Sequence, residues 1–160
     1  MHDFKEPKGG NTEKKYIDLI KQIESLTSDE TDVTAILSNI SAAIKQTFNW
    51  LWVGFYLVKE DELILGPFQG PVACFRIKKG DGVCGATWEK RKTIIVKDVE
   101  KFPGHIACSS ESKSEIVLPI FKNNNTFGVL DVDSKELDTF NEIDKKYLKK
   151  IIEIIEKKLV

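Results

Sequence analysis

The sequence predicts an α+β fold in which a central antiparallel β-sheet carries the N- and C-terminal helices packed on one face. Apolar residues recur at helical spacing near both ends of the chain, whereas the middle contains short apolar runs separated by turn residues. A chain of 160 residues suits one domain with a sizeable core. We therefore predict a flexible leader at residues 1–11 and a single domain at residues 12–160.

The first two helices follow from their apolar spacing. A helix is predicted to begin at Thr12, which would serve as its N-cap, and to end near Thr27. A second helix is predicted to end at Phe48, with Asp29 or Thr31 as its N-cap. Each helix carries an apolar stripe that can cover one face of a sheet.

The sequence period changes after the second helix. Residues Leu51–Val58 form a dense apolar and aromatic run, which is typical of a strand buried on both faces. Beyond this run, short apolar segments alternate with turns rich in Gly, Pro and charge. In chain order we predict a strand at 63–65, a loop at 66–71, a strand at 72–77, a short helix at 83–89 and a strand at 93–96.

The last third of the chain begins with a long irregular segment, predicted at 98–114. A hairpin of strands at 115–121 and 126–132 follows, closed by the turn-rich tetrapeptide at 122–125. Asp138 is expected to cap the final helix, whose apolar side chains lie on one face.

The composition excludes several classes of function. The net charge of −1 argues against a dedicated nucleic-acid or membrane-surface binder. No apolar run reaches the roughly 18 residues of a membrane span, and the N-terminus lacks a signal-peptide pattern. We therefore predict a cytoplasmic protein whose three cysteines are synthesised reduced. This odd number does not suit a purely structural disulfide framework.

Cys108 is the candidate nucleophile. It follows an apolar Pro-Gly turn and precedes a run of serines and charged residues, in the segment FPGHIACSSESKSE. Most free cysteines are buried and act as small hydrophobes. The polar neighbours of Cys108 instead favour an accessible loop, where a thiol is retained for its reactivity.

Three acidic residues are expected to converge near this cysteine. Asp131 and Asp133 are two residues apart at the end of a strand, so both side chains point to the same face. Glu115 begins the adjoining strand of the same hairpin. Like charges side by side are unfavourable unless a cation or a proton intervenes, so one carboxyl is expected to stay protonated near neutrality. A protonated carboxyl can act as a proton donor. The alternative interpretation is that the two aspartates only mark a strand end that is exposed to solvent.

The other two cysteines have open roles. Cys84 lies in the first turn of the predicted helix at 83–89, where the helix dipole would lower a thiol pKa, although it could equally fill the core. Residues Gly80–Gly85 spell G-x-G-x-x-G without a full βαβ unit, and we interpret them as a tight turn. The cysteines form no C-x₂-C pair with which His105 could complete a zinc site, so no metal is expected. We expect His105 to anchor its loop by hydrogen bonds.

A set of motifs resembles the free methionine-(R)-sulfoxide reductases, single-domain enzymes built on the GAF fold. The PGHIAC motif and the spacing of the three cysteines are the specific part of this resemblance. Trp88 departs from the small residue that is common in relatives, which bears on packing more than on chemistry. The matching segments, in order, are Asn49–Tyr56, Leu65–Gly70, Ala73–Cys74, Gly80–Gly85, Phe102–Cys108, Ser114–Val117 and Gly128–Ser134.

The resemblance implies that a GAF-like catalytic domain at 12–160 reduces free methionine-(R)-sulfoxide to methionine without a bound cofactor. Electrons would come from NADPH through thioredoxin reductase and thioredoxin. Cys108 would become a sulfenic acid, which a second thiol converts to a disulfide. Cys74 is the favoured resolving thiol because the Gly- and Pro-rich loop before it can bring it across, and Cys84 is the alternative.

The resemblance also assigns the substrate contacts. The three acids, Glu115, Asp131 and Asp133, would bind the substrate ammonium and the sulfoxide oxygen. Trp52 and Tyr56 would form an aromatic wall for the S-methyl group, although both would fit equally well as core aromatics. Two other functions stay open at this point. A GAF-type ligand sensor would use the same pocket without turnover, and a dimerisation module or homodimer would rest on the terminal helices.

Overall fold

The computed structural model describes residues 3–106 and 108–160. Residues 1 and 2 of the predicted leader, and Ala107 of the PGHIAC motif, lie outside this range. In the remainder of the leader, Lys5 and the side chain of Gln22 exchange two hydrogen bonds, of 2.8 and 2.7 Å. The flexibility of residues 1–11 stays a prediction.

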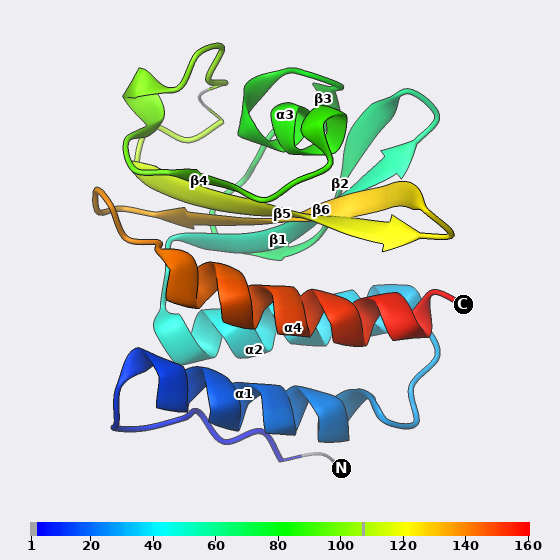
Figure 1. Ribbon diagram of the computed structural model, residues 1–160. Helices are drawn as coiled ribbons and strands as arrows, with labels where there is room; N and C mark the ends of the chain where they lie inside the picture. Colours follow the sequence, from blue (N-terminus) through cyan, green and yellow to red (C-terminus); the bar gives the residue numbers. More distant parts are fainter. Residues whose placement is uncertain (1–2, 107) are drawn as a thin grey trace.

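An antiparallel sheet of six strands organises the described residues (Figure 1). The strands are β1 (Trp52–Lys59), β2 (Glu62–Gln69), β3 (Arg76–Lys78), β4 (Ile94–Val96), β5 (Ser114–Lys122) and β6 (Asn125–Ser134). Their order in the sheet is β3-β2-β1-β6-β5-β4, and each neighbouring pair is antiparallel. The hairpin predicted at 115–132 therefore supplies two of the inner strands, and the α+β class is confirmed.

Helices cover both faces of this sheet unequally. The helices are α1 (Thr12–Thr27), α2 (Val33–Phe48), α3 (Gly82–Lys90) and α4 (Glu142–Lys158), with a short 3-10 helix, η1, at Val99–Lys101. On one face α2 and α4 pack against the strands, and α1 forms an outer layer against these two helices (Figure 1). On the other face lies α3. Among the described residues, every helix falls short of the combined length and apolarity that crossing a bilayer requires.

Strand alternation divides the apolar side chains into two cores. On β1, Val53 and Phe55 belong to the core beneath α2 and α4. Trp52 and Tyr56, in the alternate positions, belong to the second core, beneath α3. The prediction that this strand is buried on both faces is confirmed.

The helices begin at residues other than the predicted N-caps. The predictions of Thr12, of Asp29 or Thr31, and of Asp138 are wrong. The observed N-caps are Asn11, Asp32 and Asn141, whose side chains accept hydrogen bonds from the backbone N–H groups of Lys14, Ala35 and Ile143. In each case the cap is an Asn or Asp placed directly before the first helical turn, where its oxygen can reach an unpaired N–H.

Two boundaries on the β2–β3 side of the sheet also differ from the prediction. The loop predicted at 66–71 is wrong, because β2 continues to Gln69. Pro67 is tolerated there because β3 pairs only with Glu62–Ile64, so no strand requires an N–H on the outer side of Pro67. The strand predicted at 72–77 begins only at Arg76, which leaves Cys74 in a loop.

Candidate active site

A cavity of about 60 Å³ lies between the sheet, the start of α3 and the two loops that carry Cys74 and Cys108. This volume is several times what one buried water requires. The cavity brings together all but one of the predicted site residues, namely Trp52, Tyr56, Cys84, Cys108, Glu115, Asp131 and Asp133. Cys74 does not line it but is bonded to Cys108, which does.

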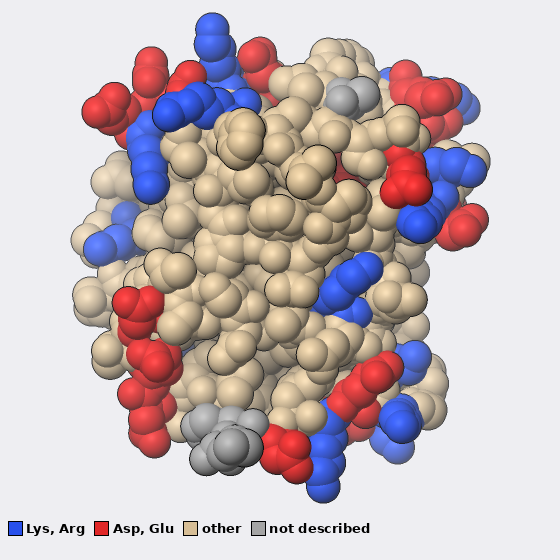
Figure 2. Space-filling view, turned by 180° about the vertical axis from the view of Figure 1, so that it is seen from behind, with Lys and Arg blue, Asp and Glu red and all other residues tan. Residues whose placement is uncertain are grey.

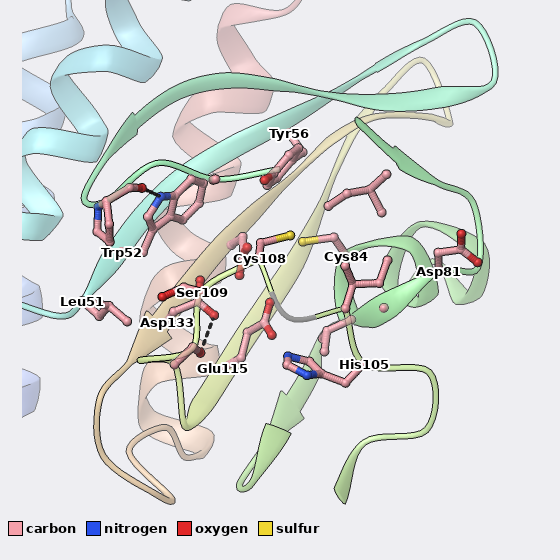
Figure 3. A pocket seen from close by; sticks show the side chains of 18 of the residues that line it. Leu51, Trp52, Tyr56, Asp81, Cys84, His105, Cys108, Ser109, Glu115 and Asp133 are labelled. Atoms are coloured by element: carbon pink, nitrogen blue, oxygen red, sulfur yellow. Dashed lines mark hydrogen bonds between the residues drawn. The ribbon is translucent and has the colours of Figure 1, made fainter. Parts of the chain in front are cut away.

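The pairing of β5 with β6 places the three carboxyl groups. Glu115 is the direct antiparallel partner of Asp133, and Asp131 pairs with Val117. All three acids therefore project from the face that α3 covers, whereas their neighbour Ile116 points into the opposite core. Figure 3 shows Glu115 and Asp133 directed into the same space as the sulfur atoms of the two labelled cysteines.

Aromatic side chains from β1 form one wall of the cavity. The ring of Trp52 stacks with that of Tyr56, at 5.9 Å between centroids, and with that of Phe68, at 5.2 Å. Its indole N–H donates a 3.0 Å hydrogen bond to the carbonyl oxygen of Pro71. Gly54 makes this packing possible, because a Cβ atom there would lie only 2.6 Å from the Trp52 ring.

A disulfide joins Cys74 to Cys108 across 34 residues of sequence, with a Cα–Cα distance of 5.4 Å. Both cysteines are half-buried on their loops. The hydroxyl of Tyr56 donates a 2.9 Å hydrogen bond to the carbonyl oxygen of Cys74. The loop that carries Cys74 is thus fixed to the central strand of the same cavity.

The third cysteine, Cys84, is a free thiol with 3% of its surface exposed. Burial raises its pKa well above the ordinary thiol value, and the nearby carboxyls of Asp131 and Glu115 raise it further. The sequence-based expectation that the start of α3 would lower this pKa is therefore wrong, because desolvation outweighs the helix dipole. Cys84 is a protonated thiol near neutral pH.

Burial also dominates the electrostatics of the carboxyl groups. It raises the pKa values of Glu115 and Asp133 well above their ordinary range, and the charge of Asp131 adds to both effects. The pKa of Asp131 is itself raised by burial. No Lys or Arg among the described residues lines the cavity. The arrangement can therefore hold a proton or accept a cation, as the sequence predicted for these acids.

Four polar residues of the cavity, Asp81, His105, Ser109 and Ser112, were not predicted as site residues. Ser112 donates a 3.1 Å hydrogen bond to Asp133, and Asp81 lines the cavity at the start of α3. The backbone N–H of His105 bonds the carbonyl oxygen of Phe102, and its imidazole ring faces the cavity (Figure 3). The only sequence signal for Ser112 was its place in the polar run after Cys108.

The fold and the cavity together define a GAF domain that carries a thiol–disulfide site beside buried carboxyl groups. The GAF-domain family profile matches residues 30–157 of the chain. The chain belongs to the GAF-domain family that includes the free methionine-R-sulfoxide reductases. This confirms both the predicted fold and the resemblance found in the sequence.

Individual relatives support this membership. The chain is 59% identical over 148 residues to GAF domain-containing protein A of Dictyostelium discoideum, covering 92% of this chain and 94% of that protein. It is 42% identical to free methionine-R-sulfoxide reductase of Saccharomyces cerevisiae, with coverages of 94% and 88%. The free methionine-R-sulfoxide reductase of Neisseria meningitidis, solved with its substrate, superposes with a TM-score of 0.96 at 48% identity, covering 99% of this chain and 96% of that one.

Proposed function

We propose that this protein reduces free methionine-R-sulfoxide to methionine by cysteine sulfenic acid and disulfide chemistry. The observation that carries the proposal is the Cys74–Cys108 disulfide next to the cavity with three acidic side chains. A closed disulfide between these two thiols is the product expected after one turnover. The substrate is inferred from relatives that are free methionine-R-sulfoxide reductases.

In the proposed reaction the Cys108 thiolate attacks the sulfoxide sulfur, and a protonated carboxyl donates a proton to the sulfoxide oxygen. The attack forms a transient bond between the two sulfur atoms. The oxygen then passes to the Cys108 sulfur while its bond to the methionine sulfur and the sulfur–sulfur bond both break, which releases methionine and leaves Cys108 as a sulfenic acid. Thiolate, sulfoxide and one proton thus yield sulfenic acid and thioether. Burial raises the pKa of both Glu115 and Asp133, but the hydrogen bond from Ser112 acts to lower that of Asp133, so Glu115 is the first candidate for the proton donor.

The remaining cavity residues would bind the substrate. Asp131 and Asp133 face the cavity without a Lys or Arg partner among the described residues, so the substrate ammonium would supply the missing positive charge. Trp52 and Tyr56 would contact the S-methyl group through the aromatic wall.

Regeneration requires two further steps. The Cys74 thiol condenses with the Cys108 sulfenic acid, which releases water and forms the disulfide. Thioredoxin then reduces this disulfide by thiol exchange, with electrons from NADPH through thioredoxin reductase and with no cofactor bound to this chain. Reduction by thioredoxin suits a reducing compartment, and we place the protein in the cytoplasm.

A homodimer is part of the same proposal. Ile17 on α1 and Ile143 on α4 are 43% and 39% exposed, and both belong to the helices on which dimerisation was predicted to rest. Figure 2 shows the opposite side of the molecule from the one on which α4 lies in Figure 1; there most charged side chains lie near the edges and the centre is largely uncharged. An uncharged central area with a charged margin also suits contact with a second copy, so this side is a second candidate surface for the homodimer.

The test is NADPH consumption coupled to thioredoxin, measured with each epimer of free methionine sulfoxide. The R epimer should sustain turnover, and Cys108→Ser should abolish it without loss of secondary structure. A GAF-type sensor would bind the ligand without NADPH consumption, and that result would reject the proposed reaction.

A further inference from the structure

Cys84 and two of the acids form a compact cluster at the base of the cavity. Its Sγ atom and one carboxylate oxygen each from Glu115 and Asp131 all lie within 4.8 Å of one another. The exposed fractions of these residues are 3%, 6% and 6%. They come from α3, β5 and β6, so three separate elements position the cluster.

One buried carboxylate oxygen of this cluster lacks a hydrogen-bond partner among the described residues. Oδ1 of Asp131 is buried and has no hydrogen-bond partner among the described residues, although Asp131 lines the cavity. Buried polar atoms in folded proteins are nearly always paired, so an exception points to a missing water or ion. A carboxylate oxygen accepts hydrogen bonds or binds cations, and no Lys or Arg of the described chain reaches this cavity.

We propose that Cys84, Glu115 and Asp131 form a binding site for one divalent cation of the zinc class, and that the bound ion closes the cavity to substrate. A thiolate with two carboxylates is a borderline-soft ligand set, which favours Zn²⁺ or Cd²⁺ over Mg²⁺ and Ca²⁺. Three protein ligands leave a fourth tetrahedral position open to the cavity, as in many zinc sites.

The geometry requires only a small adjustment. Zinc–sulfur and zinc–oxygen bonds of about 2.3 and 2.1 Å in a tetrahedron place the ligand atoms about 3.6 Å apart. The observed separations of up to 4.8 Å must therefore contract by roughly 1 Å, within reach of side-chain rotation. Cys84 would bind as the thiolate and lose its proton on metal binding.

Binding of the ion does not depend on the proposed reductase activity. Only the inhibition rests on the proposed function, since Glu115 and Asp131 would otherwise contact the substrate. The ion and free methionine sulfoxide should then exclude one another.

The site can be tested on the oxidised protein, in which the Cys74–Cys108 disulfide leaves Cys84 as the one free thiol of the three cysteines. Titration with Cd²⁺ should produce an ultraviolet thiolate-to-cadmium charge-transfer band that saturates at one ion per chain. Cys84→Ser should abolish this band. Glu115→Gln and Asp131→Asn should each weaken Cd²⁺ binding at least about tenfold. Tenfold is the lower end of the loss in metal affinity that follows when a residue that only supports a metal ligand is replaced.

Asp81→Asn is the matched control, because Asp81 lines the same cavity but lies outside the cluster and makes no side-chain cap to α3. This variant should bind Cd²⁺ as the parent does. The proposal is wrong if the parent shows no band, or if the band survives in Cys84→Ser. It is also wrong if both carboxylate variants bind Cd²⁺ unchanged, since a lone thiol would then be the ligand. Circular dichroism verifies folding, and the carboxylate variants decide the question if Cys84→Ser does not fold.

Inhibition is measured separately. Zn²⁺ should raise the apparent KM for methionine sulfoxide in the parent, and Asp81→Asn should respond in the same way. Metal binding without such competition would overturn the inhibitory role alone. Absence of reductase activity would reject the proposed function and leave the metal titration interpretable.

Discussion

The hydroxyl group of Tyr56 holds the carbonyl oxygen of Cys74 at 2.9 Å, so a residue of the central strand fixes the loop that carries one half of the disulfide. The same tyrosine lines the cavity. One side chain therefore joins the aromatic wall of the cavity to the loop that carries Cys74. Removing this hydrogen bond should affect the reaction of Cys74 more than that of Cys108.

We expect Tyr56→Phe to slow closure of the disulfide after the first methionine is released, because the Cys74 loop loses its contact with β1. The stability of the protein should fall by only about 1 kcal/mol, the usual net value of one hydrogen bond. Rapid quenching followed by thiol counting measures the closure rate. Tyr147→Phe, which removes a hydroxyl bonded to Glu13 far from the site, serves as the control. Equal closure rates in the two variants would contradict the expectation.

The resolving thiol can be identified by single-turnover measurements. Cys74→Ser should still release about one methionine per chain, since attack by Cys108 precedes resolution, and should then fail to recycle with thioredoxin. Cys84→Ser should continue to recycle, because burial keeps this thiol protonated and therefore a poor nucleophile. If the two variants exchange these behaviours, Cys84 is the resolving thiol.

Glu115 should make the stability of the protein without substrate depend on pH. Burial raises its pKa, so the folded state binds a proton more tightly than the unfolded chain does. The favourable contribution is complete below the ordinary glutamate pKa and is lost as the pH rises through the raised value. One pKa unit corresponds to about 1.4 kcal/mol, so Glu115→Gln should raise the free energy of unfolding at pH 7 by about 1 kcal/mol or more.

This gain should disappear near pH 3, well below the ordinary glutamate pKa, where Glu115 is protonated in both states. Urea unfolding at several pH values provides the measurement. Glu153→Gln on the exposed side of α4, which also replaces one glutamate by glutamine, is the control. A stability difference for Glu115→Gln that does not vary with pH would show that its carboxyl is not held protonated.

Gly54→Ala should destabilise the fold by about 1–3 kcal/mol, the usual cost of overpacking a core. The added methyl group would lie 2.3 Å from Cβ of Phe68 and 2.6 Å from the Trp52 ring, so the aromatic wall would have to move. The variant should also raise KM for the sulfoxide. Gly66→Ala on β2 is a milder control, since its added methyl group would lie 3.1 Å from the nearest atom, and equal losses in the two variants would refute the argument.

Substrate size separates this proposed activity from repair of protein-bound methionine sulfoxide. The cavity is bounded by two loops, and its three acids suit a free ammonium, which a peptide-bonded residue lacks. Loss of a buried charged partner costs about 3 kcal/mol or more, so N-acetyl-methionine sulfoxide should be reduced at least ~100-fold less efficiently. Comparable kcat/KM values for the free and acetylated substrates would contradict the role of the carboxyl groups.

Most of the fold could be predicted because the helices and inner strands have clear apolar periods. The failures lie at the β2–β3 side, where the observed structure depends on tertiary pairing. Gly66 and Pro67 have the composition of a loop, and only the short partner β3 makes room for proline in a strand. The N-cap residues were predicted wrongly because several Ser, Thr, Asp and Asn residues lie near each helix start, and the sequence alone does not show which of them caps the helix.

The sequence predicted that the three acids would lie together and that a carboxyl would stay protonated, but it predicted neither the raised pKa of Cys84 nor every polar residue of the cavity. Alternation on one hairpin was enough to bring Asp131, Asp133 and Glu115 together. The pKa of Cys84 could not be predicted from its place at a helix start, because its burial depends on three elements that are distant in sequence. Ser112 and Asp81 were missed since no short-range pattern marks a polar loop residue as facing a cavity.

Because side chains alternate along β5 and β6, natural selection on ligand binding and natural selection on core packing act on different residues of these strands. Glu115, Asp131 and Asp133 face the cavity, whereas Ile116 and Val132, interleaved with them, face the helices. A substitution at a cavity position changes the chemistry of the pocket and leaves the helix-side packing in place. Descendants of such a gene can therefore acquire new ligands while keeping the scaffold, and their divergence should concentrate at every second residue of these strands.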